Sequence, residues 1–208
     1  MLVRQRRDHQ HLETLLRRVA AGTGTDRQDA LTALCRLVFP HAFAEEAVLW
    51  PLLRRVLSDG DEMTLRVEQE HQRINELFTE LETFDPNDVE HHRLFEQIAV
   101  LLREDVRDEE DVLLPRLQEA VSPELLRRAG WAWWTVRVTA PTRAHPVVAR
   151  RPPGNALAAL PLSPIDRFRD RLDRAKQEPA VLSASTTAAV CDSRGGVKAL
   201  PAALGQRG

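Results

Sequence analysis

Histidines and carboxylates recur in this chain at a nearly constant spacing. Residues 41–51 (HAFAEEAVLWP) resemble residues 105–115 (DVRDEEDVLLP), so each position of the first segment has a counterpart 64 residues later (41 to 105). Imidazole and carboxylate groups together suit iron, manganese or zinc. The copy is imperfect, because Asp105 stands where His41 predicts a histidine. The repeat therefore indicates a metal site built from two related but unequal halves.

A second pair of motifs lies upstream of each copy. Asp8-His9 resembles Glu70-His71 at an offset of 62 residues (9 to 71). Residues four apart share one face of a helix, so the histidine or aspartate and the glutamate of each later motif face the same way. In an antiparallel bundle we expect six ligand-type groups to meet in one layer: His9, His41, Glu45, His71, Asp105 and Glu109. Without a metal, burying these groups together would be costly.

The elements that must position these groups are helices. Apolar residues at helical spacing predict four amphipathic helices at about 2–21, 27–57, 62–84 and 89–120. Turn-forming residues separate them, and no alternating strand pattern appears among them. Four helices of similar length with short connections favour an all-α, antiparallel up-down-up-down bundle. The repeat makes each half a helical hairpin.

The remaining chain divides by composition. We expect residues 1–120 to form the bundle and 121–136 a short capping helix rich in tryptophan. Residues 137–177 form a Pro/Arg-rich extension with one further short helix predicted at about 166–176. Residues 178–208 are rich in Ala, Ser, Thr and Gly, a composition typical of disorder.

Composition excludes several classes of function. A net charge of −2 gives no general attraction to nucleic acid or to an anionic membrane. No apolar run approaches the roughly 18–20 residues needed to span a bilayer, and the first residues lack the apolar region of a signal peptide. We therefore expect a cytoplasmic protein. There is no Gly-rich phosphate loop or nucleophile elbow, and the absence of tyrosine excludes a tyrosyl radical.

The motifs resemble the hemerythrin family, in its bacterial HHE cation-binding branch. The resemblance covers about residues 1–120 and rests on Asp8-His9, His41-x-x-x-Glu45-Glu46 with Pro51 downstream, Glu70-His71, and Glu109-Glu110 with Pro115 downstream. It implies a four-helix bundle holding a non-haem di-iron centre that binds dioxygen or handles peroxide or nitric oxide. Residues 140–146 also resemble a tail found in actinobacterial members.

The resemblance implies an unequal ligand set. One iron would take His9 and His41, and Glu45 and Glu109 would be the bridging carboxylates. The second iron would normally take three histidines, of which only His71 is present. The other two positions are Asn75, which leaves room for water or an exogenous ligand, and Asp105, which can still ligate. The family implies two iron ions, and a single ion is the alternative here.

The expected function is sensing or scavenging of O2, H2O2 or NO, with weak catalase-like or NO-directed activity if the protein is an enzyme. Two alternatives stay open: a zinc- or metal-storage bundle, and a metal-free interaction module. The tryptophans Trp131, Trp133 and Trp134 are read first as a cap on the bundle, and a protein-binding patch is the alternative. Pro40, inside the second helix, would either aim His41 inward or spoil the site.

Overall fold

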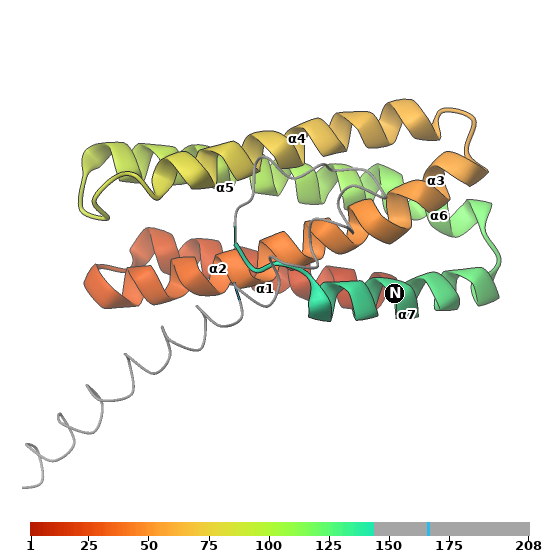
Figure 1. Cartoon of the computed structure of the whole chain (residues 1–208), viewed down its shortest axis with the longest axis horizontal. Coiled ribbons are helices and arrows are strands. Elements are labelled where there is room, and N and C mark those ends of the chain that lie inside the picture. The colour runs from red at the N-terminus through yellow and green to blue at the C-terminus, as the bar shows by residue number, and fades with distance from the viewer. Residues whose placement is uncertain (144–165, 167–208) are drawn as a thin grey trace, which may run out of the picture. The chain divides into compact units, whose positions relative to one another are not determined.

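The computed structural model describes residues 1–143 and Asp166. The chain divides into a unit of residues 1–167 and a second of residues 168–208, which lies outside the described residues. All elements of the described residues are helical (Figure 1): α1 (Leu2–Ala21), α2 (Gly24–Ala44), the π-helical segment η1 (Glu45–Leu49), α3 (Trp50–Val56), α4 (Gly60–Leu81), α5 (Val89–Asp108), the π-helical segment η2 (Glu109–Leu113), α6 (Leu114–Ala120) and α7 (Pro123–Thr139). The predicted all-α class is confirmed.

Two of the predicted helices are rods that contain a π-helical segment. α2, η1 and α3 follow one another without a break, as do α5, η2 and α6. The two rods match the predicted second and fourth helices. The first of these rods begins at Gly24 rather than at the predicted residue 27. Gly24 adopts a positive φ of 53°, which glycine tolerates readily, and the helix starts there.

The helices pack as two hairpins. α1 packs mainly against α2, and α4 mainly against α5, while contacts of α3 with α4 and of α1 with α5 join the hairpins. Figure 1 shows α4 and α5 lying together on one side and α1 and α2 on the other. This is the predicted bundle of two repeated hairpins.

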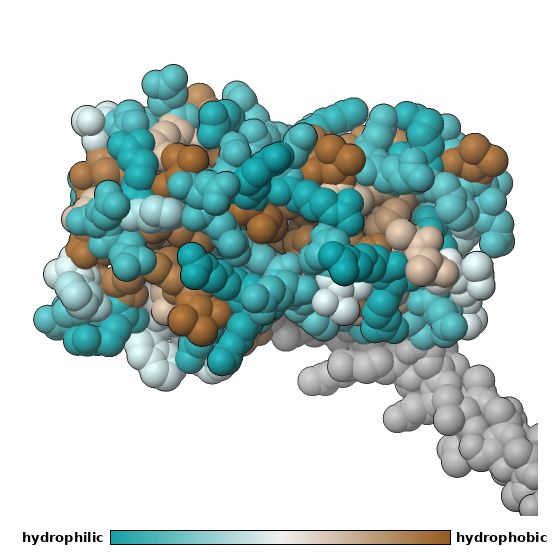
Figure 2. All heavy atoms as spheres, turned by 180° about the vertical axis from the view of Figure 1, so that it is seen from behind, coloured by the Kyte–Doolittle hydropathy of each residue, from teal (hydrophilic) through white to brown (hydrophobic). Residues whose placement is uncertain are grey.

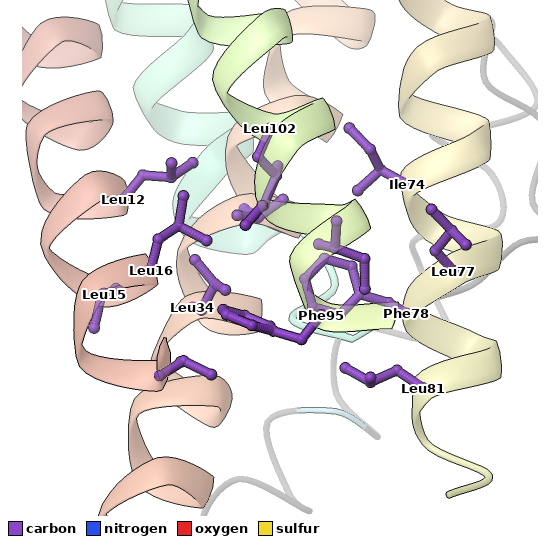
Figure 3. Close-up of a cluster of buried hydrophobic side chains, with 14 of the residues drawn as sticks. Leu12, Leu15, Leu16, Leu34, Ile74, Leu77, Phe78, Leu81, Phe95 and Leu102 are labelled. Atoms are coloured by element: carbon purple, nitrogen blue, oxygen red, sulfur yellow. The ribbon is translucent and has the colours of Figure 1, made fainter. Parts of the chain in front are cut away.

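Two apolar cores occupy the two ends of the bundle. The first takes side chains from α1, α2, α4 and α5, including Leu16, Leu34, Phe78 and Phe95, which point toward one another in Figure 3. The second is built around Trp50, with residues of α3, α6 and α7. On α1, on α4 and on the two rods, the histidines and carboxylates of the repeat lie between these two cores. The site therefore forms a polar layer between two apolar ones.

Pro40 does not end its helix. It is buried inside α2, which continues to Ala44. His41 follows it and is also buried, with 8% of its surface exposed. The first of the two alternatives for Pro40, an inward-facing His41, is therefore the observed one.

His91 lies in the first turn of α5 and is buried rather than facing solvent. His91 is 3% exposed, and the Arg27 guanidinium donates a hydrogen bond to its Nδ1 over 3.2 Å. Arg27 comes from α2 and also donates to the Val19 carbonyl at 2.8 Å. Position in α5 alone could not indicate this contact, because the partner belongs to another helix.

The helix α7 ends at Thr139, three residues beyond the predicted boundary of 136. Only Trp133 of its tryptophans is buried, at 1% exposure, whereas Trp131 and Trp134 are 63% and 41% exposed. On the face shown in Figure 2, hydrophobic residues are interspersed with hydrophilic ones. The predicted helix at 166–176 lies outside the described residues except for Asp166, and the predicted disordered tail lies wholly outside them. No helix in the described part of the chain is long and apolar enough to cross a membrane.

Candidate metal centre

All six residues singled out in the sequence are buried and lie close together. They form two groups, and within each group the ligand atoms lie within 4.8 Å of one another. The first group is His9, His41, Glu45 and Glu109, and the second is His71, Asp105 and Glu109. Glu109 belongs to both groups. Glu45 belongs to the first only, so the geometry gives the two glutamates different places in the centre.

The first group brings the Nε2 atoms of two imidazoles together, with the rings tilted by 56°. His9 Nε2 and His41 Nε2 are 3.2 Å apart. Glu45 Oε1 lies 3.0 Å from His41 Nε2, and Glu109 Oε2 lies 3.3 Å from His9 Nε2. Two nitrogens and two carboxylates thus converge on one point between α1, α2 and the start of η2.

The second group has a single imidazole. His71 Nε2 lies 3.3 Å from Asp105 Oδ1 and 4.0 Å from Glu109 Oε1. Its donors are therefore one nitrogen and two carboxylates. A set richer in oxygen favours harder cations, so the two halves of the centre differ in chemistry as well as in sequence.

A carboxylate contacts the outer nitrogen of each of the three histidines. His9 Nδ1 is 2.7 Å from Glu110 Oε1, and His71 Nδ1 is 2.9 Å from Glu46 Oε1. A carboxylate that accepts from Nδ1–H turns Nε2 toward the centre, as the nitrogen that would bind a cation. The two glutamates act across the repeat: Glu46 of the first hairpin serves a histidine of the second, and Glu110 of the second serves one of the first.

Both π-helical segments begin at a candidate ligand. Consecutive residues of an α-helix point about 100° apart, and a π-helical turn adds one residue to the turn. At η1 the wider turn lets Glu45 and Glu46 both face the interior, with 1% and 0% of their surfaces exposed. η2 begins in the same way at Glu109 and Glu110. Each wide turn thus supplies one carboxylate to the centre and one to a histidine of the other hairpin.

The charges of the centre shift its protonation. Burial alone would lower the pKa of His41, but the Glu45 carboxylate and the hydrogen bond to Asp8 outweigh it and raise that pKa to about 10. Burial would raise the pKa of Glu45, and His41 outweighs it and lowers that pKa to about 2. Burial and the neighbouring charges of Glu45 and Asp105 raise the pKa of Glu109 to about 8. Without a cation, the centre therefore retains protons where its donors converge.

The donor atoms fit a bound cation. Among the six candidate ligands, four buried atoms have no hydrogen bond: Glu45 Oε2, His71 Nε2, Asp105 Oδ1 and Glu109 Oε1. Buried polar atoms are nearly always hydrogen-bonded in proteins. These four belong to the two groups, so the residues present suit one or two metal ions.

A cavity of about 60 Å³ adjoins the centre. Its apolar wall is formed by Leu12, Leu37, Val38, Phe39, Ile74, Leu102 and Val106. Asn75, the position where the family resemblance implied a histidine, also lines it, as do Pro141 and Arg143 beyond α7. A buried water needs on the order of 10–15 Å³ of such space, so the cavity admits only molecules of a few heavy atoms.

Sequence reasoning missed several supporting residues. Gln5 is fully buried and donates a hydrogen bond to Glu45 Oε1 over 2.7 Å. The orienting roles of Glu46 and Glu110 were also missed, although the repeated Glu-Glu pair is a signal for them. If both members of such a pair face inward, the helix must widen there.

The fold and the site together define a class, namely helical-bundle proteins with a buried histidine–carboxylate centre for a cation. The chain belongs to the hemerythrin HHE cation binding domain family, whose model matches residues 2–117. It is also 25% identical over 135 residues to an uncharacterised hemerythrin-like protein of the yeast Schizosaccharomyces pombe, covering 64% of this chain and 66% of that protein. No solved structure matches the chain significantly.

Proposed function

We propose that this protein holds non-haem iron at the paired groups and that it senses or scavenges O2, peroxide or NO there. The observation that carries the proposal is the pair of converging imidazoles. His9 and His41 each direct Nδ1 at a carboxylate, which turns both Nε2 atoms toward the same point, where they are 3.2 Å apart. In the metal-free protein the raised pKa of His41 keeps a proton at this point, and a bound metal ion would take the place of that proton.

The ligand assignment follows the two groups. His9, His41 and Glu45 would hold the first iron, His71 and Asp105 the second, and Glu109 would bridge them. The family pattern implies that Glu45 would bridge the two irons as well. Bound iron would supply a redox-active Lewis acid for a small oxidant or diatomic molecule.

The residues around the centre select what reaches it. The cavity is lined largely by apolar side chains, and its volume of about 60 Å³ is large enough for O2, H2O2 or NO. Asn75 borders the cavity and is 3% exposed. An amide there is a weaker ligand than imidazole, so it leaves the second iron more open to an exogenous molecule.

The test uses the full chain, prepared without metal and loaded anaerobically with Fe²⁺. Samples are exposed separately to O2, H2O2 and NO, and absorption and electron paramagnetic resonance spectra are recorded. Zinc-loaded protein is the redox-inactive control. We expect new iron-dependent spectra and faster peroxide loss than with the zinc form. A chain that retains no iron, or iron that responds to none of the three molecules, would contradict the proposal, and a chain that retains zinc but no iron would favour the zinc-bundle alternative.

A further inference from the structure

The helix α7 lies outside the segment that matches the family, yet it reaches the candidate metal centre. The family model ends at residue 117, and α7 runs from Pro123 to Thr139. It packs mainly against α2 and η1, the elements that carry His41 and Glu45. Two of its residues, Trp133 and Arg137, are placed to act on the centre.

Trp133 packs directly on a candidate ligand. Its ring lies edge-on to the His41 ring, with centroids 5.3 Å apart and an interplanar angle of 86°. Trp133 is 1% exposed and belongs to the core beside the centre. An edge-to-face aromatic contact of this kind has a preferred geometry, so the indole limits how the imidazole can tilt.

Arg137 is connected to His41 indirectly, through Asp8. Its Nε lies 2.8 Å from Asp8 Oδ2, and the same oxygen lies 3.0 Å from His41 Nδ1. The Arg137 guanidinium also lies over the Trp133 ring, 5.7 Å from its centroid. Arginine, aspartate and histidine thus form a chain from α7 through α1 to α2. The side chains of Arg137 and Asp8 are only 24% and 21% exposed, so the ion pair is partly shielded from solvent.

The second hairpin has no equivalent of this chain. The counterpart of Asp8 is Glu70, and the counterpart of His41 is Asp105, which cannot donate to it as an imidazole does. Burial and the charges of Asp105 and Asp108 raise the pKa of Glu70. The support from α7 therefore belongs to the first group alone.

We propose that Arg137 and Trp133 are positioning residues of the first metal site, so that α7 is a working part of the centre. Arg137 acts through Asp8, whose carboxylate it holds against His41 Nδ1, and Trp133 acts on the His41 ring itself. The inference rests on the proposed metal function. Loss of an outer hydrogen-bonding partner of a metal-bound histidine typically weakens metal binding about 10- to 100-fold.

The experiment compares full-length variants. Arg137→Gln removes the charge and keeps most of the packing on Trp133, Arg137→Lys keeps a cation, and Arg128→Ala is the matched control on the same helix, where Arg128 pairs with Glu124 at the surface. Affinity is measured with Zn²⁺ against a chelator, and the ligand field with the absorption spectrum of bound Co²⁺. Thermal unfolding of the metal-free proteins checks that each variant folds.

We expect Arg137→Gln to weaken the tighter Zn²⁺ site about 10-fold or more and to alter the Co²⁺ spectrum. Arg137→Lys should restore much of both, and Arg128→Ala should change neither. In an Asp8→Asn background, Arg137→Gln should have little further effect, because it acts through Asp8.

Unchanged affinity and spectrum in Arg137→Gln, or a fully additive effect with Asp8→Asn, would overturn this inference and leave the metal function standing. Wild-type protein that binds neither Zn²⁺ nor Co²⁺ would overturn the metal function itself, and this inference with it.

Discussion

Asp105 is the residue at which the two halves of the centre differ. The repeat places it opposite His41, and the structure places its Oδ1 3.3 Å from His71 Nε2. The second group therefore exchanges an imidazole for a carboxylate. That exchange favours harder and more highly charged cations, and it makes reversible oxygen carriage at two equivalent irons a poor fit.

Replacing Asp105 tests whether it causes the difference between the two metal sites. We predict that Asp105→His strengthens the weaker metal site by roughly tenfold or more, because it restores an imidazole at a buried position facing His71. Metal titration followed by elemental analysis measures the change. Asp108→His, a more exposed substitution one turn along α5, is the control and should leave both affinities as they are. An unchanged weaker site in Asp105→His would contradict the ligand role of position 105.

Among the elements, the two π-helical segments contribute most to assembling the candidate metal centre. Each begins at a Glu-Glu pair and directs one carboxylate toward the centre and the other toward a histidine of the opposite hairpin. Glu46 contacts His71 Nδ1, and Glu110 contacts His9 Nδ1. Neither hairpin can therefore complete its own half of the site.

Because each of these glutamates contacts a histidine of the other hairpin, replacing it should weaken the metal site of the other hairpin. Glu46→Gln, in the first hairpin, should weaken the metal held by His71, by about 10- to 100-fold. Glu110→Gln, in the second hairpin, should weaken the metal held by His9, and by less, because the Glu110 side chain is 31% exposed and Glu46 is fully buried. Chelator competition on both variants measures the two affinities. If each substitution weakened the site of its own hairpin instead, the account of the wide turns would be wrong.

The start of α5 contributes a pH dependence that does not involve the metal. Burial, and then the charge of Arg27, lowers the pKa of His91 below its ordinary value of 6.5. Folding therefore favours the neutral imidazole, and this stabilisation is present above about pH 6.5 and is lost as the pH falls through the lower pKa of the folded state.

We predict that His91→Gln, which can still accept from Arg27 and cannot be protonated, loses less stability than wild type between neutral and mildly acidic pH. His91→Ala should cost about 1–3 kcal/mol at neutral pH, because it leaves Arg27 a bond short. Denaturant unfolding of metal-free protein measures both, with His92→Gln at the exposed neighbouring position as control. An equal acid loss in wild type and His91→Gln would refute the assignment.

The helices could be predicted because their apolar spacing is local. The π-helical segments could not, since apolar spacing alone does not distinguish a single wide turn from a regular one. The burial of His91 also escaped prediction, because it depends on Arg27 from another helix. In the same way, the repeat indicated the candidate ligands by type and spacing, whereas the contacts of Gln5, Trp133 and Arg137 depend on the packing of helices that share no motif.

At the scale of the whole molecule, the bundle holds a polar layer between two apolar cores. The cores account for the packing of both hairpins, and the layer collects the six candidate ligands. Such a layer is costly to bury when its groups lack partners. A bound cation offsets that cost, so metal binding and the stability of the middle of the bundle are expected to rise together.

We propose that this layer holds two metal ions with unequal affinity, and anaerobic titration of the metal-free full chain with Fe²⁺ tests this. We predict one tighter and one weaker site per chain. His41→Ala should abolish the tighter site, His71→Ala the weaker one, and His11→Ala, at an exposed position on α1, neither. Wild-type protein that binds no iron, or an iron stoichiometry that neither His41→Ala nor His71→Ala lowers, would contradict unequal binding at this layer.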